Sequence, residues 1–142
     1  VVEDDEDDYF LIASTLKHTK FDCDVRWVQN GEEAMSYLLR QNEWQDPIKS
    51  PSPSLILLDI NLPKKNGLEV LQEIQQNPTL KNLLTIVLTS SKTKANIVAA
   101  YDFGANSYVQ KPAEIDQFIK GMQLTLEYWF QWVKHPFHTA EG

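Results

Sequence analysis

Four consecutive aliphatic residues followed by an acidic one constrain the fold of this chain more than any other segment. Residues 55–58 are all leucine or isoleucine, Asp59 follows them directly, and Pro63 comes shortly after. An unbroken aliphatic run is typical of a strand buried on both faces, and a proline cannot continue a paired strand. In open α/β sheets, functional groups lie at the carboxyl ends of such strands. The segment therefore predicts a buried parallel strand that presents Asp59 at a functional site.

Alternating strands and helices are expected along the rest of the chain. Apolar spacing predicts short strands at about residues 1–2, 25–28, 55–59, 84–89 and 107–110. It predicts helices at about residues 7–19, from Gly31 to Leu39, and at 67–75, 92–103 and 113–134. This alternation is typical of a parallel sheet covered by helices on both faces. We expect an α/β fold with a doubly wound five-stranded parallel sheet, formed by residues 1–142 as a single domain.

The composition restricts the class of protein. The chain has 142 residues, a formal net charge of −7 and 42% hydrophobic residues, which is typical of one soluble globular domain. The acidic balance argues against a nucleic-acid-binding surface, and no apolar run is long enough to span a bilayer. The single cysteine, Cys23, cannot form an internal disulfide, which fits a cytoplasmic protein. Because Val1 falls inside an expected strand and is not a methionine, we also expect residues upstream of it.

Several polar residues stand where parallel strands would end at the same edge of the sheet. They are Glu3, Asp4, Asp59, Thr89 and Lys111. Two carboxylates about 5 Å apart repel each other by roughly 3 kcal/mol at an effective dielectric constant near 20. A divalent cation removes this conflict, and Mg²⁺ prefers a few carboxylates together with waters and phosphate oxygens. We therefore expect a magnesium site at this edge.

The chemistry expected at this edge is phosphoryl transfer. Asp59 can act as a nucleophile and form an aspartyl phosphate, while the metal and Lys111 offset the charge of the transferred group. The hydroxyl of Thr89 can bond a phosphoryl oxygen, and the backbone carbonyl of Asn61 is placed to be a further metal ligand. We interpret the acidic residues 5–8 as a solvated first helical turn, where the helix dipole favours negative charge.

Four blocks of the sequence together resemble the signature of a known family. The blocks are Val2-Glu3-Asp4, Leu58-Asp59-Ile60-Asn61-Leu62-Pro63, Val87-Leu88-Thr89-Ser90 and Tyr108-Val109-Gln110-Lys111-Pro112. In this order, and over nearly the whole chain, they resemble the receiver domains of two-component response regulators. The resemblance implies a flavodoxin-like (βα)5 receiver fold, a bound Mg²⁺ and a phosphoryl group that comes from a sensor histidine kinase.

The same resemblance implies a role for each matched residue. It makes Asp59 the phosphoacceptor, and it assigns metal binding to Glu3, Asp4, Asp59 and the backbone carbonyl of Asn61. It assigns the response to the phosphoryl group to the hydroxyl of Thr89, the aromatic ring of Tyr108 and the ammonium group of Lys111. It also implies a cis peptide bond before Pro112, which a functional turn can justify.

A narrower resemblance concerns the partner. The segments 59–67 and 75–81, the aromatic residues 128–130 and the long loop 41–54 are similar to those of small response regulators paired with cyanobacterial phytochromes. This resemblance implies that the sensor histidine kinase is a phytochrome.

The last predicted helix carries apolar residues on two faces. One face should pack on the sheet, whereas Leu124, Tyr128 and Trp132 fall on a nearly opposite face with a spacing of four. Exposed aromatic patches of this kind usually mark interfaces. We expect a homodimer through the extended C-terminal helix, about residues 113–134, with a contribution from Tyr101. The alternative is that the C-terminal segment folds back over its own domain.

We therefore predict a single-domain response regulator, not an enzyme, which switches its protein-interaction surface after phosphorylation of Asp59. One rival is a haloacid-dehalogenase-like phosphatase, but that class normally needs a second aspartate where this chain has Asn61. A flavodoxin-like flavin binder needs an uncharged phosphate loop, and residues 3–8 are acidic. A degenerate receiver that acts only as a binding module is the remaining alternative.

Overall fold

The structure is a computed structural model in which residues 1–134 are described. Residues 135–142, which the single-domain prediction included, lie outside the described part. The elements follow one another as α1 (Glu6–Lys17), α2 (Gly31–Leu38), the 3₁₀ turn η1 (Asn42–Trp44), β1 (Ile56–Leu58), α3 (Gly67–Gln76), β2 (Thr85–Thr89), α4 (Lys94–Asp102), β3 (Ser107–Gln110), α5 (Ile115–Glu127) and the π-helical turn η2 (Tyr128–Trp132).

The sheet is parallel, and its strands lie in the order β1-β2-β3. Val2 forms single parallel bridges to Val28 on one side and to Leu58 on the other. These bridges continue the sheet beyond β1. The predicted strand at residues 1–2 lies between the segment 25–28 and β1. This order is that of flavodoxin-like folds.

The prediction of five strands is confirmed only in part. Within the described part of the chain, three segments are long enough to count as strands, while residues 1–2 and 25–28 contribute single bridges. Residues 25–28 form the edge of the sheet and pair on one side only. Arg26 in this edge segment uses its side chain to bind Asp24 and the carbonyl of Lys49, outside the sheet.

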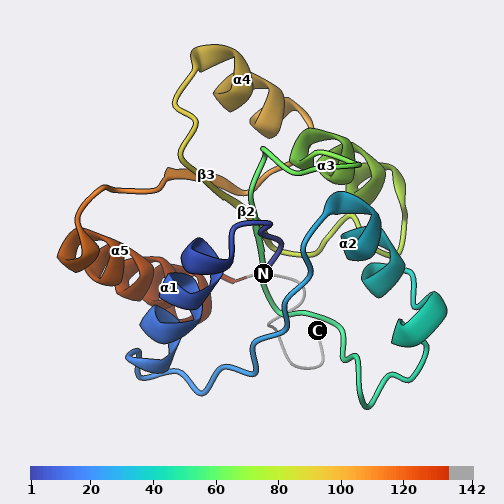
Figure 1. Ribbon diagram of the computed structural model, residues 1–142, viewed down its shortest axis with the longest axis horizontal. Helices are drawn as coiled ribbons and strands as arrows, with labels where there is room; N and C mark the ends of the chain where they lie inside the picture. The colour runs from blue at the N-terminus through green and yellow to red at the C-terminus, as the bar shows by residue number, and fades with distance from the viewer. Residues whose placement is uncertain (135–142) are drawn as a thin grey trace.

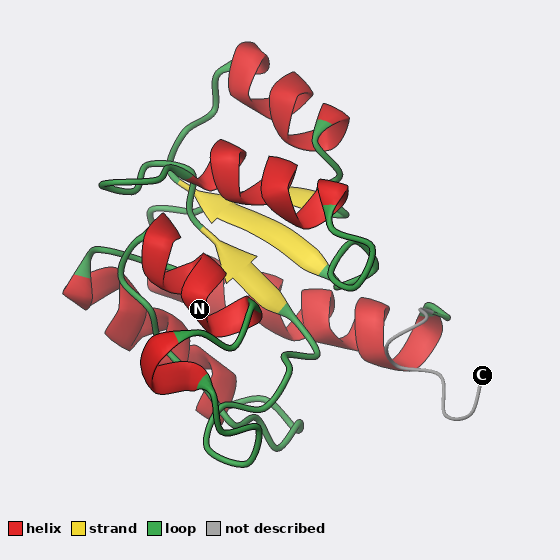
Figure 2. Cartoon of the chain, turned by 90° about the vertical axis from the view of Figure 1, so that its right-hand side faces the viewer, coloured by secondary structure: helices red, strands yellow, loops and turns green. Residues whose placement is uncertain are grey.

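Helices cover both faces of the sheet (Figures 1 and 2). Leu57 of β1 and Ile86 of β2 pack with α1 and α5 on one face, where Phe118, Met122 and Leu126 are buried. Their neighbours in sequence, Leu58 and Val87, point to the other face, toward α2, α3 and α4. This alternation follows from the two-residue period of a strand. Residues 56–58 of the aliphatic run are therefore buried, with side chains on both faces of the sheet, as the sequence predicts.

Short polar side chains begin most of the helices. The carboxylate of Asp5 accepts a hydrogen bond from the backbone N–H of Asp8 at the start of α1. Asn30, Asn66 and Thr93 cap α2, α3 and α4 in the same way. Such caps satisfy backbone donors that have no partner within the helix. The caps therefore fix where the loops at the edge of the sheet end.

The last helix is shorter than predicted. Its α-helical part ends at Glu127, and a π-helical turn follows, in which the N–H of Val133 donates to the carbonyl of Tyr128. The bulky run 128–132 contains four aromatic residues, and the wider turn spreads their side chains. Trp129 and Phe130 pack against the core, whereas Tyr128 and Trp132 stay exposed. The expected uninterrupted helix over about residues 113–134 is therefore replaced by α5 and η2.

Candidate functional site

The end of the first sheet segment places Glu3 at the edge of the sheet. The backbone N–H of Glu3 donates to the carbonyl of Val28 at 3.1 Å, which continues the pairing made by Val2. Its side chain is buried, and the carboxylate accepts a hydrogen bond from the backbone N–H of Asp5 at 3.1 Å. Asp4 follows at an exposed bend just before α1. Pairing in the sheet therefore fixes the position of Glu3, and Asp4 follows it directly in the chain.

Asp59 lies at the end of β1, as predicted, with its side chain nearly buried. Its backbone N–H donates to the carbonyl of Val2 at 3.1 Å, so the first segment and β1 end side by side. One oxygen of its carboxylate accepts a hydrogen bond from the backbone N–H of Asn61 at 3.2 Å. The other oxygen remains available to a ligand, apart from a contact with Lys111.

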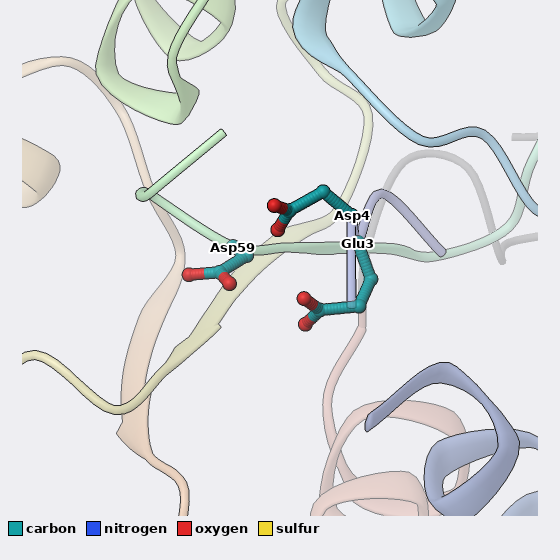
Figure 3. A group of neighbouring side chains, drawn as sticks. All are labelled: Glu3, Asp4 and Asp59. Atoms are coloured by element: carbon teal, nitrogen blue, oxygen red, sulfur yellow. The ribbon is translucent and has the colours of Figure 1, made fainter. Parts of the chain in front are cut away.

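The three predicted carboxylates meet at this edge of the sheet (Figure 3). One oxygen atom each of Glu3, Asp4 and Asp59 lies within 4.8 Å of the others. The oxygens of Glu3 and Asp4 turn toward Asp59. A set of hard oxygen donors with partial exposure to solvent suits Mg²⁺, which keeps several waters. The donor set therefore fits a divalent cation. The orientation of the Asn61 carbonyl is not tested, and its role as a further ligand stays a prediction.

Lys111 supplies the positive charge at the site. Its ammonium group donates to Glu3 at 2.6 Å and to Asp8 at 2.9 Å, and it lies 3.6 Å from Asp59. The backbone N–H of Lys111 donates to the carbonyl of Thr89 at 2.8 Å, which aligns the residue after β3 with the end of β2. The structure thus brings Lys111 together with Glu3, Asp8 and Asp59. A shallow depression beside it is lined by Asp8, Ser90, Lys111 and Pro112, among others.

The charges at the site favour binding of a cation in addition to the ammonium group of Lys111. Burial raises the pKa of the Glu3 carboxyl to about 7, and the hydrogen bonds from Lys111 and from the Asp5 backbone oppose this rise only in part. Burial alone would lower the pKa of Lys111, but its hydrogen bonds to Asp8 and Glu3 outweigh that effect and hold its pKa above the usual value. One ammonium group thus does not fully compensate the negative charge of the neighbouring carboxylates.

Thr89 and Tyr108 occupy neighbouring strands behind the site. Thr89 is fully buried at the end of β2, and its hydroxyl oxygen accepts a long hydrogen bond of 3.4 Å from the backbone N–H of Ser91. Tyr108 of β3 is half-buried, and its hydroxyl donates to the carbonyl of Ser91 at 2.7 Å. The loop that follows Thr89 is therefore held by both residues.

Two glycines allow close packing around the loop that follows Asp59. A Cβ atom at Gly67 would lie 2.2 Å from the carbonyl oxygen of Asp59, and one at Gly31 would lie 1.9 Å from the carbonyl oxygen of Lys65. The N–H of Gly67 donates to the carbonyl of Ile60 at 2.9 Å. Only glycine can bring the helix starts this close to the backbone, so α2 and α3 hold the loop in place from two sides.

The structure corrects two predictions at this edge. Within residues 1–134 every peptide bond is trans, so the predicted cis bond before Pro112 is wrong. The trans form is intrinsically favoured by about 0.5–1 kcal/mol before proline. Asp8, which was interpreted as a solvated helix residue, binds Lys111 instead. Since α1 begins only two residues after Asp4, its first turn lies beside the site.

The predicted interface residues lie on the surface. Leu124, Tyr128 and Trp132 expose 57%, 55% and 81% of their surface, and Tyr101 exposes 49%. The hydroxyl of Tyr101 also accepts a hydrogen bond of 3.0 Å from the backbone N–H of Tyr108 on β3. Tyr101 therefore covers part of the sheet edge.

Within residues 1–134, no helix is both long and apolar enough to cross a membrane.

Comparison with known proteins gives consistent matches. The model of the response regulator receiver domain family matches residues 1–123. Response regulator Rcp1 of Synechocystis sp. is 38% identical over 136 residues, which are 96% of this chain and 90% of that protein.

Solved structures agree with this match. The phosphorylated cyanobacterial phytochrome response regulator RcpA is 38% identical, with a TM-score of 0.88 over 95% of this chain and 94% of that chain. The Mn²⁺-bound form of response regulator Rcp1 is also 38% identical, with a TM-score of 0.85 over 95% of each chain. The parallel sheet with helices on both faces is therefore the flavodoxin-like receiver fold.

Proposed function

Because this chain belongs to the family of response regulator receiver domains, we propose that it accepts a phosphoryl group on Asp59 from a phosphohistidine of a sensor kinase. The observation that supports this proposal best is the gathering of Glu3, Asp4 and Asp59 within 4.8 Å, with the ammonium group of Lys111 3.6 Å from Asp59. The arrangement combines a nucleophile, a cation site and a counter-charge within reach of one phosphoryl group.

The proposed reaction exchanges one bond to phosphorus for another. A carboxylate oxygen of Asp59 attacks the phosphorus atom, the bond between phosphorus and the imidazole nitrogen of the donor breaks, and the nitrogen leaves with the bonding electron pair. Asn61 restrains the other oxygen of Asp59 through its backbone N–H. The chain takes up one phosphoryl group per site, so we regard it as a stoichiometric acceptor rather than as an enzyme.

Mg²⁺ held by Glu3, Asp4 and Asp59 would supply positive charge to the phosphoryl oxygens during transfer. The preference for Mg²⁺ over other divalent ions is part of the proposal, and the Mn²⁺ named for the Rcp1 structure belongs to that protein. Lys111 would exchange its hydrogen bonds to Glu3 and Asp8 for one to the phosphoryl group.

The proposed response follows from the residues behind the site. The hydroxyl of Thr89 would move toward a phosphoryl oxygen, which removes the acceptor that now binds the N–H of Ser91. Tyr108 would then turn inward and release the carbonyl of Ser91. The position of α4, which begins after this loop, is thereby biased, and this is a two-state switch driven by a covalent ligand.

The proposed partner is a histidine kinase of the phytochrome type, and the supporting observation is the similarity to the phytochrome response regulator RcpA. Such a transfer would place the chain in the cytoplasm, which the free and exposed Cys23 also fits. We further propose a homodimer through Leu124, Tyr128, Trp132 and Tyr101, because these side chains are exposed, the first three on the consecutive elements α5 and η2 and Tyr101 on α4.

The experiment that tests the function is phosphorylation with acetyl phosphate and Mg²⁺. We expect the mass of the wild-type chain to increase by one phosphoryl group, which hydroxylamine removes. Asp59→Asn should abolish the increase, because an amide cannot form the acyl phosphate. Asp102→Asn, an exposed residue at the end of α4, is the matched control and should be labelled like the wild type.

Three results would contradict the proposal. Retained labelling of Asp59→Asn would exclude Asp59 as the acceptor. A wild-type chain that takes no label from acetyl phosphate or from any autophosphorylated phytochrome kinase would favour the binding-module alternative. Rapid, repeated hydrolysis of a phosphate monoester would instead favour a phosphatase.

A further inference from the structure

Trp27 is a residue beside the acidic edge to which the sequence pattern gives no role. It lies in the edge segment 25–28, immediately before the bridging residue Val28. Its indole ring stacks on Tyr9 of α1, with the ring centres 4.1 Å apart and the planes 3° from parallel. Its indole N–H donates to the backbone carbonyl of Glu3 at 2.7 Å. The stacking fixes the direction in which this donor points.

The hydrogen bond completes the restraint of Glu3. The backbone N–H of Glu3 binds Val28, and its carboxylate binds the N–H of Asp5 and the ammonium group of Lys111. With the bond from Trp27, the backbone N–H, the carbonyl and both carboxylate oxygens have partners. The carbonyl of Glu3 belongs to the peptide unit that leads into Asp4. Because a peptide unit is planar, a restraint on this carbonyl also restrains the backbone N–H of Asp4.

Asp4 depends on this restraint more than the other two carboxylates. It is exposed, and no residue among 1–134 holds its carboxylate through a hydrogen bond. Nevertheless its oxygen lies within 4.8 Å of those of Glu3 and Asp59 (Figure 3). The backbone that precedes Asp4 fixes the starting point of its side chain and thereby limits the positions that its carboxylate can reach. Groups behind the metal ligands that fix their geometry commonly set metal affinity.

We propose that Trp27 is a positioning residue of the metal site, which orients Asp4 through the Glu3 carbonyl. The proposal rests on the proposed function only in that the site binds Mg²⁺. Trp27 itself touches neither the metal nor the phosphoryl group. Loss of its donor should free the peptide unit between Glu3 and Asp4 while the carboxylates remain chemically unchanged.

The test is the Mg²⁺ affinity of Trp27→Phe, measured by calorimetric titration. Phenylalanine can still stack on Tyr9 but has no donor, so we expect the dissociation constant to rise about three- to tenfold, the effect of one neutral hydrogen bond. Trp44→Phe is the matched control, because Trp44 packs against Tyr37 in another part of the fold. It should bind Mg²⁺ like the wild type.

A double-mutant cycle with Asp4→Asn tests the route of the effect. If Trp27 acts through Asp4, the substitution Trp27→Phe should change the affinity by no more than about twofold once Asp4 is replaced. An undiminished effect in the Asp4→Asn background would overturn the proposed route. Equal Mg²⁺ affinity of wild type and Trp27→Phe would overturn the positioning role while leaving phosphorylation of Asp59 intact. A wild type without Mg²⁺ affinity would overturn the proposed function itself.

A second measurement covers the case in which Trp27→Phe does not fold. The indole N–H of Trp27 gives its own proton–nitrogen NMR signal, and this signal can be assigned in the wild type. We expect it to shift during Mg²⁺ titration with the same midpoint as the calorimetric binding, whereas the signal of the exposed Trp132 stays in place. An unchanged Trp27 signal at saturating Mg²⁺ would overturn the proposal.

Discussion

Lys111 is the residue on which the electrostatics of the metal-free site depend. Its ammonium group lies within 3.6 Å of Asp59 and donates to Glu3 and Asp8. Removal of one member of a buried ion pair leaves the others uncompensated, and this typically costs about 3–5 kcal/mol. The lower end of this range applies because the Asp8 side chain is 44% exposed. Lys111 therefore stabilises the fold as long as no cation is bound.

We expect Lys111→Met to lower the free energy of unfolding by about 3 kcal/mol without metal, at a pH where the carboxylates are ionised. Saturating Mg²⁺ should restore more stability to this variant than it adds to the wild type, since the cation replaces the missing charge. Urea unfolding with and without Mg²⁺ measures both effects. Lys120→Met on the exposed face of α5 is the control and should change little. Equal Mg²⁺ effects on Lys111→Met and wild type would contradict this account.

At the residue scale, some contacts at the candidate site can be predicted from the sequence, whereas others cannot. Glu3, Asp59 and Lys111 are predictable because each directly follows a predicted strand, and parallel topology alone brings strand ends together. The contacts of Asp8 and Trp27 depend on the rotation of α1 and on side-chain rotamers, which no local pattern specifies. The trans bond before Pro112 shows the same limit, because a sequence match carries no direct information about an isomer.

At the scale of elements, the loop after Asp59 is positioned by two helices that begin in the same way. Each begins with an asparagine cap followed by a glycine, at Asn30 and Gly31 for α2 and at Asn66 and Gly67 for α3. The caps satisfy the first backbone donors, and the glycines allow contact with the carbonyls of Lys65 and Asp59. Both helices, which pack against the core, thus hold the loop after Asp59 in a fixed position at the candidate site.

We expect Gly67→Ala to destabilise the fold by about 2 kcal/mol or more, because the added Cβ would lie 2.2 Å from a backbone oxygen. The added Cβ should displace this oxygen, which is the backbone carbonyl oxygen of Asp59, and so it should also weaken Mg²⁺ binding. Gly121→Ala is the matched substitution, as nothing lies within 4 Å of its Cβ position in α5. It should stabilise by about 0.5–1 kcal/mol. Thermal unfolding distinguishes the two, and a neutral Gly67→Ala would refute the proposed role of Gly67.

The elements themselves are predicted best where strand pairing is continuous. The segments 84–89 and 107–110 agree with β2 and β3 to within one residue, because β2 is buried throughout and β3 pairs with it along its whole length. The prediction fails at residues 25–28, where the pairing is limited to a single bridge. It also fails after Glu127, because apolar periodicity does not distinguish an α-helix from the π-helical turn that follows.

At the scale of the molecule, the last described elements leave an apolar surface that no other residue among 1–134 covers. Phe130 packs against Phe21, with ring centres 6.0 Å apart, so part of the aromatic segment covers its own core. Tyr128 and Trp132 instead remain exposed, and together they would bury roughly 300 Å² on association, given about 200 Å² for a large aromatic side chain. This is more than a third of the ~800 Å² that each partner contributes to a typical interface.

We expect the wild-type chain to sediment as a dimer and the Tyr128→Ala, Trp132→Ala double variant as a monomer. Central aromatic residues of an interface contribute about 2 kcal/mol or more each, so each substitution should weaken association about 30-fold or more. The α-helical core of α5 should be unaffected, because Phe118, Met122 and Leu126 face the sheet. Circular dichroism of the variant tests this point.

The control for the dimer is the double variant Leu39→Ala, Ile48→Ala, which removes exposed apolar side chains from the opposite part of the chain. It should remain a dimer, because Leu39 is the C-cap of α2 and Ile48 lies in the loop that follows, outside the proposed interface. A wild-type chain that sediments as a monomer at all concentrations, or a double variant of Tyr128 and Trp132 that stays dimeric, would contradict an interface on this surface. The first outcome would leave the phosphorylation site untouched, since Glu3, Asp4, Asp59 and Lys111 all come from one chain.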